Sequence, residues 1–184
     1  MKSLALALAV SGAFVLTVPL SSPATASIET PEAQMMASSA ADDAREAMLE
    51  TFGVSSVAAG KFLWADKAPT DGPVRIVVSL NDQRAYVYRA DELVAVSSIS
   101  TGVAGRDTPT GIFPILEKRP IYHSKKYDNA PMPFMQRIDQ YGIALHAGHV
   151  TGAPASHGCV RLPAKFAARL YGVTEIGSTV LIGA

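Results

Sequence analysis

The hydrophobic pattern changes character near residue 73, where short β-rich runs begin. β-Branched and aromatic residues gather in runs separated by Asn, Asp, Gly or Pro, as is typical of strands joined by turns. The predicted strands are 74–80, 84–89, 93–100, 111–118, 142–146 and 178–182, with a turn at 81–83. One short helix is predicted over 164–171, with Pro163 as its first residue and Gly172 closing it in the left-handed conformation. We therefore predict a mainly β domain over 73–184 with one short helix.

The stretch before this domain has a weaker pattern. Residues 27–72 are rich in Ala, Ser and acidic residues, and Ala44, Met48 and Phe52 recur at helical spacing. We predict an N-terminal tail that contains a short helix within 42–52.

The first 26 residues read as a secretory signal peptide. Lys2 precedes an apolar run, and Ala24-Thr25-Ala26 offers a small-residue cleavage site. An uncleaved membrane anchor is the alternative, although Gly12 and Pro19 interrupt the run and make it a poor spanning helix. The sequence predicts export to the periplasm or cell envelope, with cleavage near Ala26.

Net charge and cysteine content limit the classes of function that the sequence supports. The formal net charge is zero, which gives no electrostatic case for binding nucleic acid or an anionic membrane surface. Cys159 is the single cysteine, so no internal disulfide can form, and an unpaired thiol in an exported protein is a liability unless it is used. The alternative is a buried, inert cysteine that acts as a small hydrophobic residue.

The segment 146–162 carries the candidate chemistry, because it holds this cysteine and three of the four histidines. His146 follows an apolar strand, and Gly158 permits a sharp turn before Cys159. A thiol with an imidazole base, beside backbone N–H groups that bind an oxyanion, suits acyl transfer through a thioester. No acidic residue lies between Gln140 and Thr174, so we expect a backbone carbonyl to orient His146.

Two further features stay open. A zinc site built from His146, His149, His157 and Cys159 fits the residue types, but zinc hydrolases normally supply a carboxylate base, and this segment has none. Residues 118–138 contain three prolines and several aromatic residues, and they predict an irregular lid over a binding site or an ordinary surface connection. The candidate substrate-binding residues in this lid are Tyr122, His123, Met132 and Phe134.

The segment Ser156-His157-Gly158-Cys159-Val160-Arg161-Leu162, with a histidine upstream at the end of a strand, resembles the signature of YkuD-type L,D-transpeptidase catalytic domains. The segments 100–102, 108–113 and 131–134 are also similar to that family, so the resemblance covers roughly 74–184. It implies a β-sandwich-like fold with the catalytic cysteine at one mouth.

The resemblance also implies a reaction and roles for residues. Cys159 would attack the carbonyl of the third residue of a peptidoglycan tetrapeptide stem, release D-Ala, and pass the acyl group to an amine, giving 3→3 cross-links. His146 carries over as general base, the backbone at His157, Gly158 and Cys159 as oxyanion hole, and Ser156 and His157 as support for the turn. Arg161 also matches a family position, and here it would contact a substrate carboxylate, set the phase of the loop, or form a structural ion pair.

Several alternatives remain at this point. Transfer to water would make the protein an L,D-carboxypeptidase, and a non-catalytic wall-binding module is a third class. Stem peptides are the expected partners, an outer-membrane protein or a free D-amino acid is a further candidate acceptor, and we expect a monomer without a cofactor. Many relatives have Gly or Ser after the base histidine, whereas this chain reads His146-Ala-Gly-His149, which leaves His149 as a rival to His146.

Overall fold

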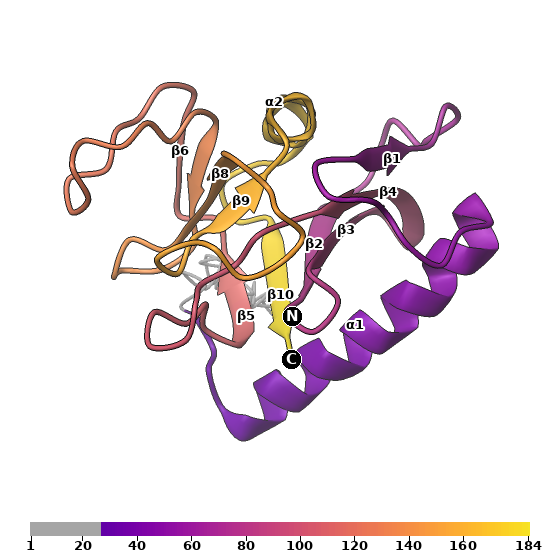
Figure 1. Ribbon diagram of the computed structural model, residues 1–184. Helices are drawn as coiled ribbons and strands as arrows, with labels where there is room; N and C mark the ends of the chain where they lie inside the picture. Colours follow the sequence, from indigo (N-terminus) through magenta and orange to yellow (C-terminus); the bar gives the residue numbers. More distant parts are fainter. Residues whose placement is uncertain (1–26) are drawn as a thin grey trace, which may run out of the picture.

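Two β-sheets and two helices make up the part of the chain that the computed structural model describes, residues 27–184 (Figure 1). The predicted signal peptide lies outside these residues. The six-stranded sheet has the order β1-β4-β3-β2-β10-β5, and the four-stranded sheet has the order β6-β7-β8-β9. The larger sheet contains β1 (Phe62–Trp64), β2 (Val74–Ser79), β3 (Arg84–Arg89), β4 (Glu92–Ser98), β5 (Gly111–Pro114) and β10 (Thr179–Gly183). The smaller sheet contains β6 (Glu117–Arg119), β7 (Met135–Arg137), β8 (Ala144–Ala147) and β9 (Val160–Leu162). The predicted mainly β class is confirmed.

The main core lies between the two sheets. Side chains alternate along β2, so Ile76 and Val78 face inward, where they join Leu145 of β8 and Val160 of β9 in one buried cluster. Helix α2 (Ala164–Val173) closes this cluster through Phe166 and its neighbours. The short helix predicted after Cys159 is therefore present and packs beside the segment that carries the candidate chemistry.

The second helix, α1 (Pro31–Phe52), covers the opposite face of the six-stranded sheet (Figure 1). Its buried residues recur at helical spacing (Ala33, Ala37, Ala41, Ala44 and Met48). The last three of them form a second buried cluster with residues of the sheet that include Val77 and Tyr86. Thr30 caps its N-terminus by accepting a hydrogen bond from the Ala33 N–H at 3.3 Å, and Gly53 ends it with φ +67°. The prediction of a tail with a short helix over 42–52 is wrong, because the helix is 22 residues long and belongs to the domain.

The N-terminal segment reaches both edges of the large sheet. Ile28 forms an isolated bridge with Ile112 of β5, with N–H···O distances of 2.8 and 2.9 Å. After α1, the three-residue strand β1 pairs antiparallel with β4 at the other edge. The segment from Ile28 to β1 therefore pairs with β5 at one edge of the large sheet, covers one face of the sheet through α1, and pairs with β4 at the other edge.

Three smaller expectations also change. The predicted strand 111–118 is two strands, β5 and β6, which belong to different sheets. Strand β7 lies within 118–138, so the predicted lid is part loop and part strand. Helix α2 continues to Val173, past Gly172, and Thr174 follows it in an extended conformation. No helix within 27–184 is long and apolar enough to cross a membrane.

Candidate active site

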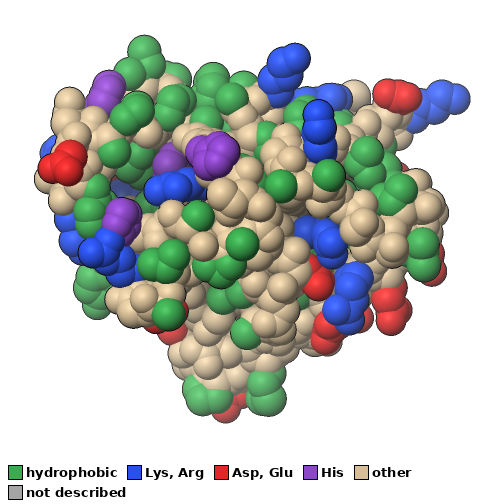
Figure 2. Space-filling view, in the orientation of Figure 1, with side chains coloured by type: hydrophobic (Ala, Val, Ile, Leu, Met, Phe, Trp, Pro, Cys, Tyr) green, Lys and Arg blue, Asp and Glu red, His purple; other side chains and the backbone are tan. Residues whose placement is uncertain are grey.

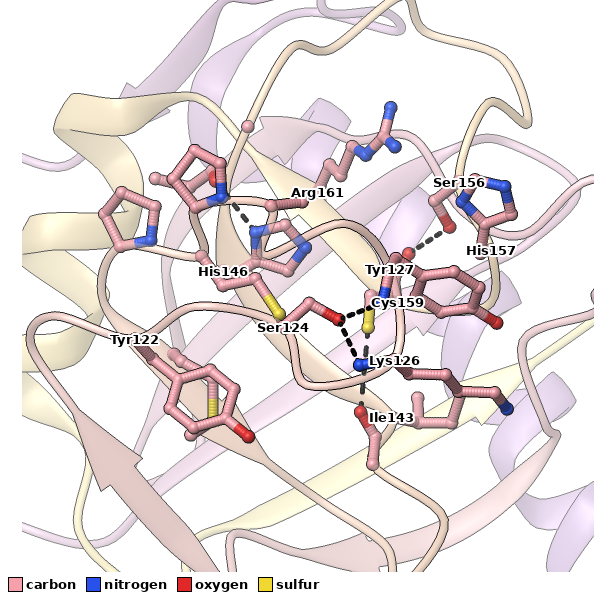
Figure 3. Close-up of a pocket in the computed structure, with 18 of the residues that line it drawn as sticks. Tyr122, Ser124, Lys126, Tyr127, Ile143, His146, Ser156, His157, Cys159 and Arg161 are labelled. Carbon is pink, nitrogen blue, oxygen red and sulfur yellow. Dashed lines mark hydrogen bonds between the residues drawn. The ribbon is translucent and has the colours of Figure 1, made fainter.

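His146 and Cys159 come together because β8 and β9 are parallel neighbours. Leu145 pairs with Val160, and His146 pairs with Arg161. Since Leu145 and Val160 point into the core, alternation turns His146 and Cys159 to the other face of this sheet. Both residues line a cavity of about 660 Å³, in which Figure 3 shows the imidazole and the thiol.

A backbone carbonyl orients the His146 ring. The side chain is only 7% exposed, and its Nδ1 lies 2.8 Å from the carbonyl oxygen of Ala147. A carbonyl can only accept, so Nδ1 carries the proton and Nε2 of the neutral ring is free to accept one. Burial lowers the pKa of His146, the positive charge of Arg161 lowers it further, and the Ala147 carbonyl opposes both. The neutral, proton-accepting form is therefore favoured.

The thiol of Cys159 is held in a largely apolar setting. Its Sγ points to the carbonyl oxygen of Gly142 at 3.8 Å, and it packs against a cluster of Met132, Met135 and Ala144. Burial raises the pKa of Cys159, and the charge of Asp139 adds to this, while the backbone of Ala144 and the charge of Arg161 lower it. The two shifts together favour a resting pair of neutral thiol and neutral imidazole.

The turn before Cys159 depends on Ser156 and Gly158. The Ser156 hydroxyl donates to the Cys159 carbonyl at 2.5 Å and accepts from the Gly158 N–H at 3.1 Å. Gly158 has φ +110°, and a Cβ there would lie 2.7 Å from Cδ1 of Ile143, so only glycine fits. The Gly158 N–H, expected in an oxyanion hole, is instead used inside the turn.

A second layer of hydrogen bonds fixes this turn to the segments 100–102 and 108–113. The hydroxyl of Thr108 donates to the Gly158 carbonyl at 2.8 Å and accepts from the Gly102 N–H at 2.9 Å. The Thr101 carbonyl accepts the N–H groups of Ala155 and Ser156, both at 2.9 Å. Thus the segments whose sequence resembled the family, but to which no role was assigned, hold the turn in place.

Gln83 completes this layer from the turn between β2 and β3. Its side chain is buried, donates to the Thr101 hydroxyl at 2.6 Å and accepts from the Thr101 N–H at 3.0 Å. Sequence reasoning missed it, because a polar residue in an Asn-Asp-Gln turn carries no signal of burial. Its positive φ of 51° belongs to the turn.

The loop between β6 and β7 forms one wall of the cavity. Tyr122 and Met132 line the cavity, as substrate-binding residues would. Tyr127 stacks on the ring of His157, with ring centroids 4.6 Å apart and planes at 20°. The His157 side chain is exposed and stacks on this loop, whereas the side-chain hydrogen bonds inside the turn come from Ser156.

Two predicted contacts in this loop lie elsewhere. Phe134 is absent from the cavity lining and packs against Tyr171 of α2, with ring centroids 5.9 Å apart. His123 is exposed and also outside the lining. Phe134 and His123 therefore do not line this cavity, whereas the exposed His149 and the partly buried Arg161 do.

Positive charge predominates around the cavity. Four basic residues line it (Lys125, Lys126, Arg137 and Arg161), and its lining contains no Asp or Glu. Figure 2 shows histidine and basic side chains around a hollow at the left of the molecule. An anionic ligand is therefore favoured over a cationic one.

The zinc alternative lacks a ligand cluster. Within residues 27–184, no group of three or more His, Cys, Asp or Glu side chains lies close enough to hold a metal ion. His149 and His157 are exposed, while His146 is turned to the Ala147 carbonyl. The geometry supports a thiol–imidazole site instead.

Comparisons with protein-family models and with solved structures point to the same family. The YkuD family, described as the L,D-transpeptidase catalytic domain, matches residues 73–182. A search of curated proteins finds no match.

Solved structures with this fold include three described as L,D-transpeptidases. The enzyme from Stackebrandtia nassauensis is 28% identical with a TM-score of 0.56, over 63% of this chain and 57% of its own. The enzyme from Mycobacterium smegmatis is 22% identical with a TM-score of 0.56, over 60% and 58%. An LD transpeptidase solved in complex with imipenem is 21% identical with a TM-score of 0.55, over 59% and 58%. This chain spans less than two thirds of the length of each. The match over 73–182 shows that the chain belongs to the YkuD family of L,D-transpeptidase catalytic domains.

Proposed function

We propose that this protein is a peptidoglycan L,D-transpeptidase that forms 3→3 cross-links. The observation that carries the proposal is that His146 of β8 and Cys159, the residue directly before the neighbouring parallel strand β9, both line one cavity. The basic lining of that cavity suits a tetrapeptide stem, which carries several carboxylates.

The first half-reaction transfers the acyl group to sulfur. Nε2 of His146 accepts the Cys159 proton as Sγ attacks the carbonyl carbon of the third stem residue. The C–N bond to D-Ala then breaks, the imidazolium gives its proton to the leaving amine, and a thioester remains. Since burial lowers the pKa of His146 and raises the pKa of Cys159, both shifts favour neutral groups, and we expect proton transfer to accompany attack.

The second half-reaction returns the enzyme to its starting state. The side-chain amine of another stem attacks the thioester, His146 takes a proton from that amine, and Cys159 leaves and is reprotonated. An outer-membrane protein or a free D-amino acid is a further candidate acceptor. Water in place of the amine gives the second candidate function, L,D-carboxypeptidase, which uses the same residues.

We also propose that the protein is exported and acts in the periplasm or cell envelope, as a monomer, after cleavage near Ala26. Expression of the full sequence in a bacterial host, followed by intact-mass measurement of the envelope fraction, should give a chain that begins at Ser27. A chain that retains Met1 or Lys2 would contradict cleavage.

Intact-mass spectrometry tests the reaction. Incubation with a disaccharide tetrapeptide, and separately with imipenem, should acylate the wild-type protein and leave Cys159→Ala unmodified. His146→Gln should slow acylation by at least about a hundredfold, since a general base contributes roughly 10²–10⁴-fold. The matched control is His149→Gln, which changes an exposed histidine at the cavity edge and should keep most of the rate.

The products separate the two candidate functions. Cross-linked dimer together with a Cys159 adduct supports the transpeptidase, and tripeptide without dimer supports the carboxypeptidase. No adduct with either compound would overturn both.

A further inference from the structure

The loop between β6 and β7 brings two lysines to the cavity that holds the thiol. Lys125 and Lys126 both line this cavity and are both exposed. Neither lysine forms a salt bridge with any residue of 27–184. The Lys126 ammonium lies over the Tyr127 ring, 5.6 Å from its centroid, so neither lysine charge is neutralised by a carboxylate of the described residues.

The other charges near the cavity are already engaged or lie apart. Arg137 pairs with Glu117 at 3.0 Å and also donates to the Asp139 carbonyl. The Asp139 carboxylate accepts the N–H groups of Tyr141 and Ile143 at 2.9 and 2.8 Å. Asp128 is exposed and absent from the lining. Asp139 still acts on the Cys159 thiol through its charge, so the basic residues of the lining without a carboxylate partner are the lysine pair and Arg161.

The position of these lysines is tied to the candidate nucleophile. The Ser124 hydroxyl accepts the N–H groups of Lys126 and Tyr127 at 3.3 and 3.1 Å, which forms a tight turn (Figure 3). Tyr127 then stacks on His157, two residues before Cys159. The turn and the stack thus join the loop that carries both lysines to the segment 156–159, and the lysines line the same cavity as the Cys159 sulfur.

We propose that Lys125 and Lys126 make the site selective for donor stems with free carboxylates over the same stems with carboxamides. This inference rests on the proposed function. A carboxamide keeps the shape of a carboxylate but lacks its charge, so the difference between the two ligands isolates the electrostatic contribution of the lysines. Because both lysines are exposed, water and salt reduce this contribution without removing it.

Competition between two stems measures the selectivity. One tetrapeptide carries free carboxyl groups, and the other carries carboxamides at the second and third residues, with the terminal D-Ala unchanged in both. The acylation rate of Cys159 at limiting stem concentration is followed by intact mass. We expect the wild-type protein to prefer the free acid by about threefold to tenfold, in keeping with exposed charge pairs.

Three double variants test whether the preference for the free acid comes from Lys125 and Lys126. Lys125→Gln with Lys126→Gln should bring the ratio of the two rates close to one, whereas Lys125→Arg with Lys126→Arg should retain it. The matched control, Lys61→Gln with Lys67→Gln, makes the same change in net charge away from the cavity and should leave the ratio at the wild-type value.

Salt gives a test that needs no variant. Raising the ionic strength from about 0.05 M to about 0.5 M should compress the wild-type ratio, because the screening length falls severalfold. Equal acylation of wild type by both stems, or an unchanged ratio in the glutamine variant, would overturn the selectivity alone. Acylation by neither stem would instead overturn the proposed function.

Discussion

At the scale of single residues, burial favours the neutral forms of the candidate nucleophile and base over a thiolate–imidazolium ion pair. Burial raises the pKa of Cys159 and lowers the pKa of His146, so both shifts favour neutral forms. Such a thiol resists alkylation and oxidation at neutral pH, because both reactions need the thiolate. A substrate that displaces water and approaches His146 would supply the conditions for proton transfer.

The pH dependence of Cys159 alkylation tests whether the thiol and the imidazole are both neutral at rest. Because the folded-state pKa of the thiol is raised, the rate of iodoacetamide modification should stay low through neutral pH and rise only above the usual thiol range. The measurement is intact mass against time in a buffer series, with unfolded protein as the reference for a normal thiol. A plateau of fast modification already below pH 7 would indicate a thiolate–imidazolium pair and contradict the neutral pair.

Thr108 offers a second test at this scale. Thr108→Val keeps the side-chain shape but leaves the Gly102 N–H and the Gly158 carbonyl without their partner, a loss of about 1–3 kcal/mol for a buried group. If the turn shifts, acylation should slow by about tenfold or more, since about 1.4 kcal/mol in the barrier is tenfold in rate.

Thr110→Val is the matched control for Thr108, because the Thr110 hydroxyl makes no hydrogen bond within the described residues 27–184. A fall in melting temperature without a fall in the acylation rate of the folded fraction would show that Thr108 acts on stability alone. Rescue by Thr108→Ser, which restores the hydroxyl, should separate geometry from side-chain volume.

The sequence alone predicted those site residues whose position follows from the residues next to them in the chain. His146 follows an apolar strand and Gly158 precedes the single cysteine, so alternation and turn chemistry placed both near Cys159. A backbone carbonyl does accept from His146, as the lack of nearby acids indicated. The Tyr127–His157 stack and the burial of Gln83 could not be predicted from the sequence. Each depends on a contact between segments that are distant in sequence and share no periodic pattern.

At the scale of elements, α1 is the main departure from the sequence-based prediction. Its buried face consists mostly of alanine, which gives little hydrophobic contrast with its Ser, Asp and Glu neighbours. The capping pair Thr30-Pro31 was the signal available, since Thr at the N-cap and Pro at the first position mark a helix start. The strands of residues 74–98 were predicted well because their β-branched runs are long and bounded by turns. The three-residue strands β1, β6, β7 and β9 carry too few residues for a pattern.

Paired substitutions on α1 test its part in stability. Met48 is fully buried against the six-stranded sheet, so Met48→Ala should lower the free energy of unfolding by about 2–5 kcal/mol. For a domain of this size, that corresponds to a fall of roughly 5–15 °C in melting temperature. Met36→Ala, on the same helix but 61% exposed, is the control and should change little. Equal effects of the two substitutions in thermal denaturation would mean that α1 does not pack as described.

At the scale of the whole molecule, the cavity is bordered by the segment 156–159 on one side and by the loop between β6 and β7 on the other. The segment 156–159 is fixed to the sheets by Thr101 and Thr108, whereas the loop between β6 and β7 contacts it through Tyr127 on His157. If the proposed function holds, we expect this contact to limit the access of water to the thioester on Cys159.

Substitution of Tyr127 tests this expectation. Tyr127→Ala removes the stacking ring and should raise the fraction of thioester lost to water about twofold to fivefold, because an aromatic pair contributes roughly 0.5–1.5 kcal/mol. Tyr127→Phe keeps the ring and should match the wild type. The measurement is the ratio of tripeptide to cross-linked dimer at fixed acceptor concentration. An unchanged ratio in the alanine variant would show that the stack does not shield the thioester.

The segment that begins at Ile28 and ends at β1 has a consequence for association between copies. Exposed sheet edges invite strand addition by another chain, which leads to aggregation at high local concentration. Here one outer strand, β1, is only three residues long, and the other, β5, already exchanges two hydrogen bonds with Ile28. In the smaller sheet, Ser100 bridges Arg161 and covers the side of β9. Little unpaired backbone is thus left at the two edges of the larger sheet, so we expect the segment from Ile28 to β1 to hinder the addition of a strand from a second copy there.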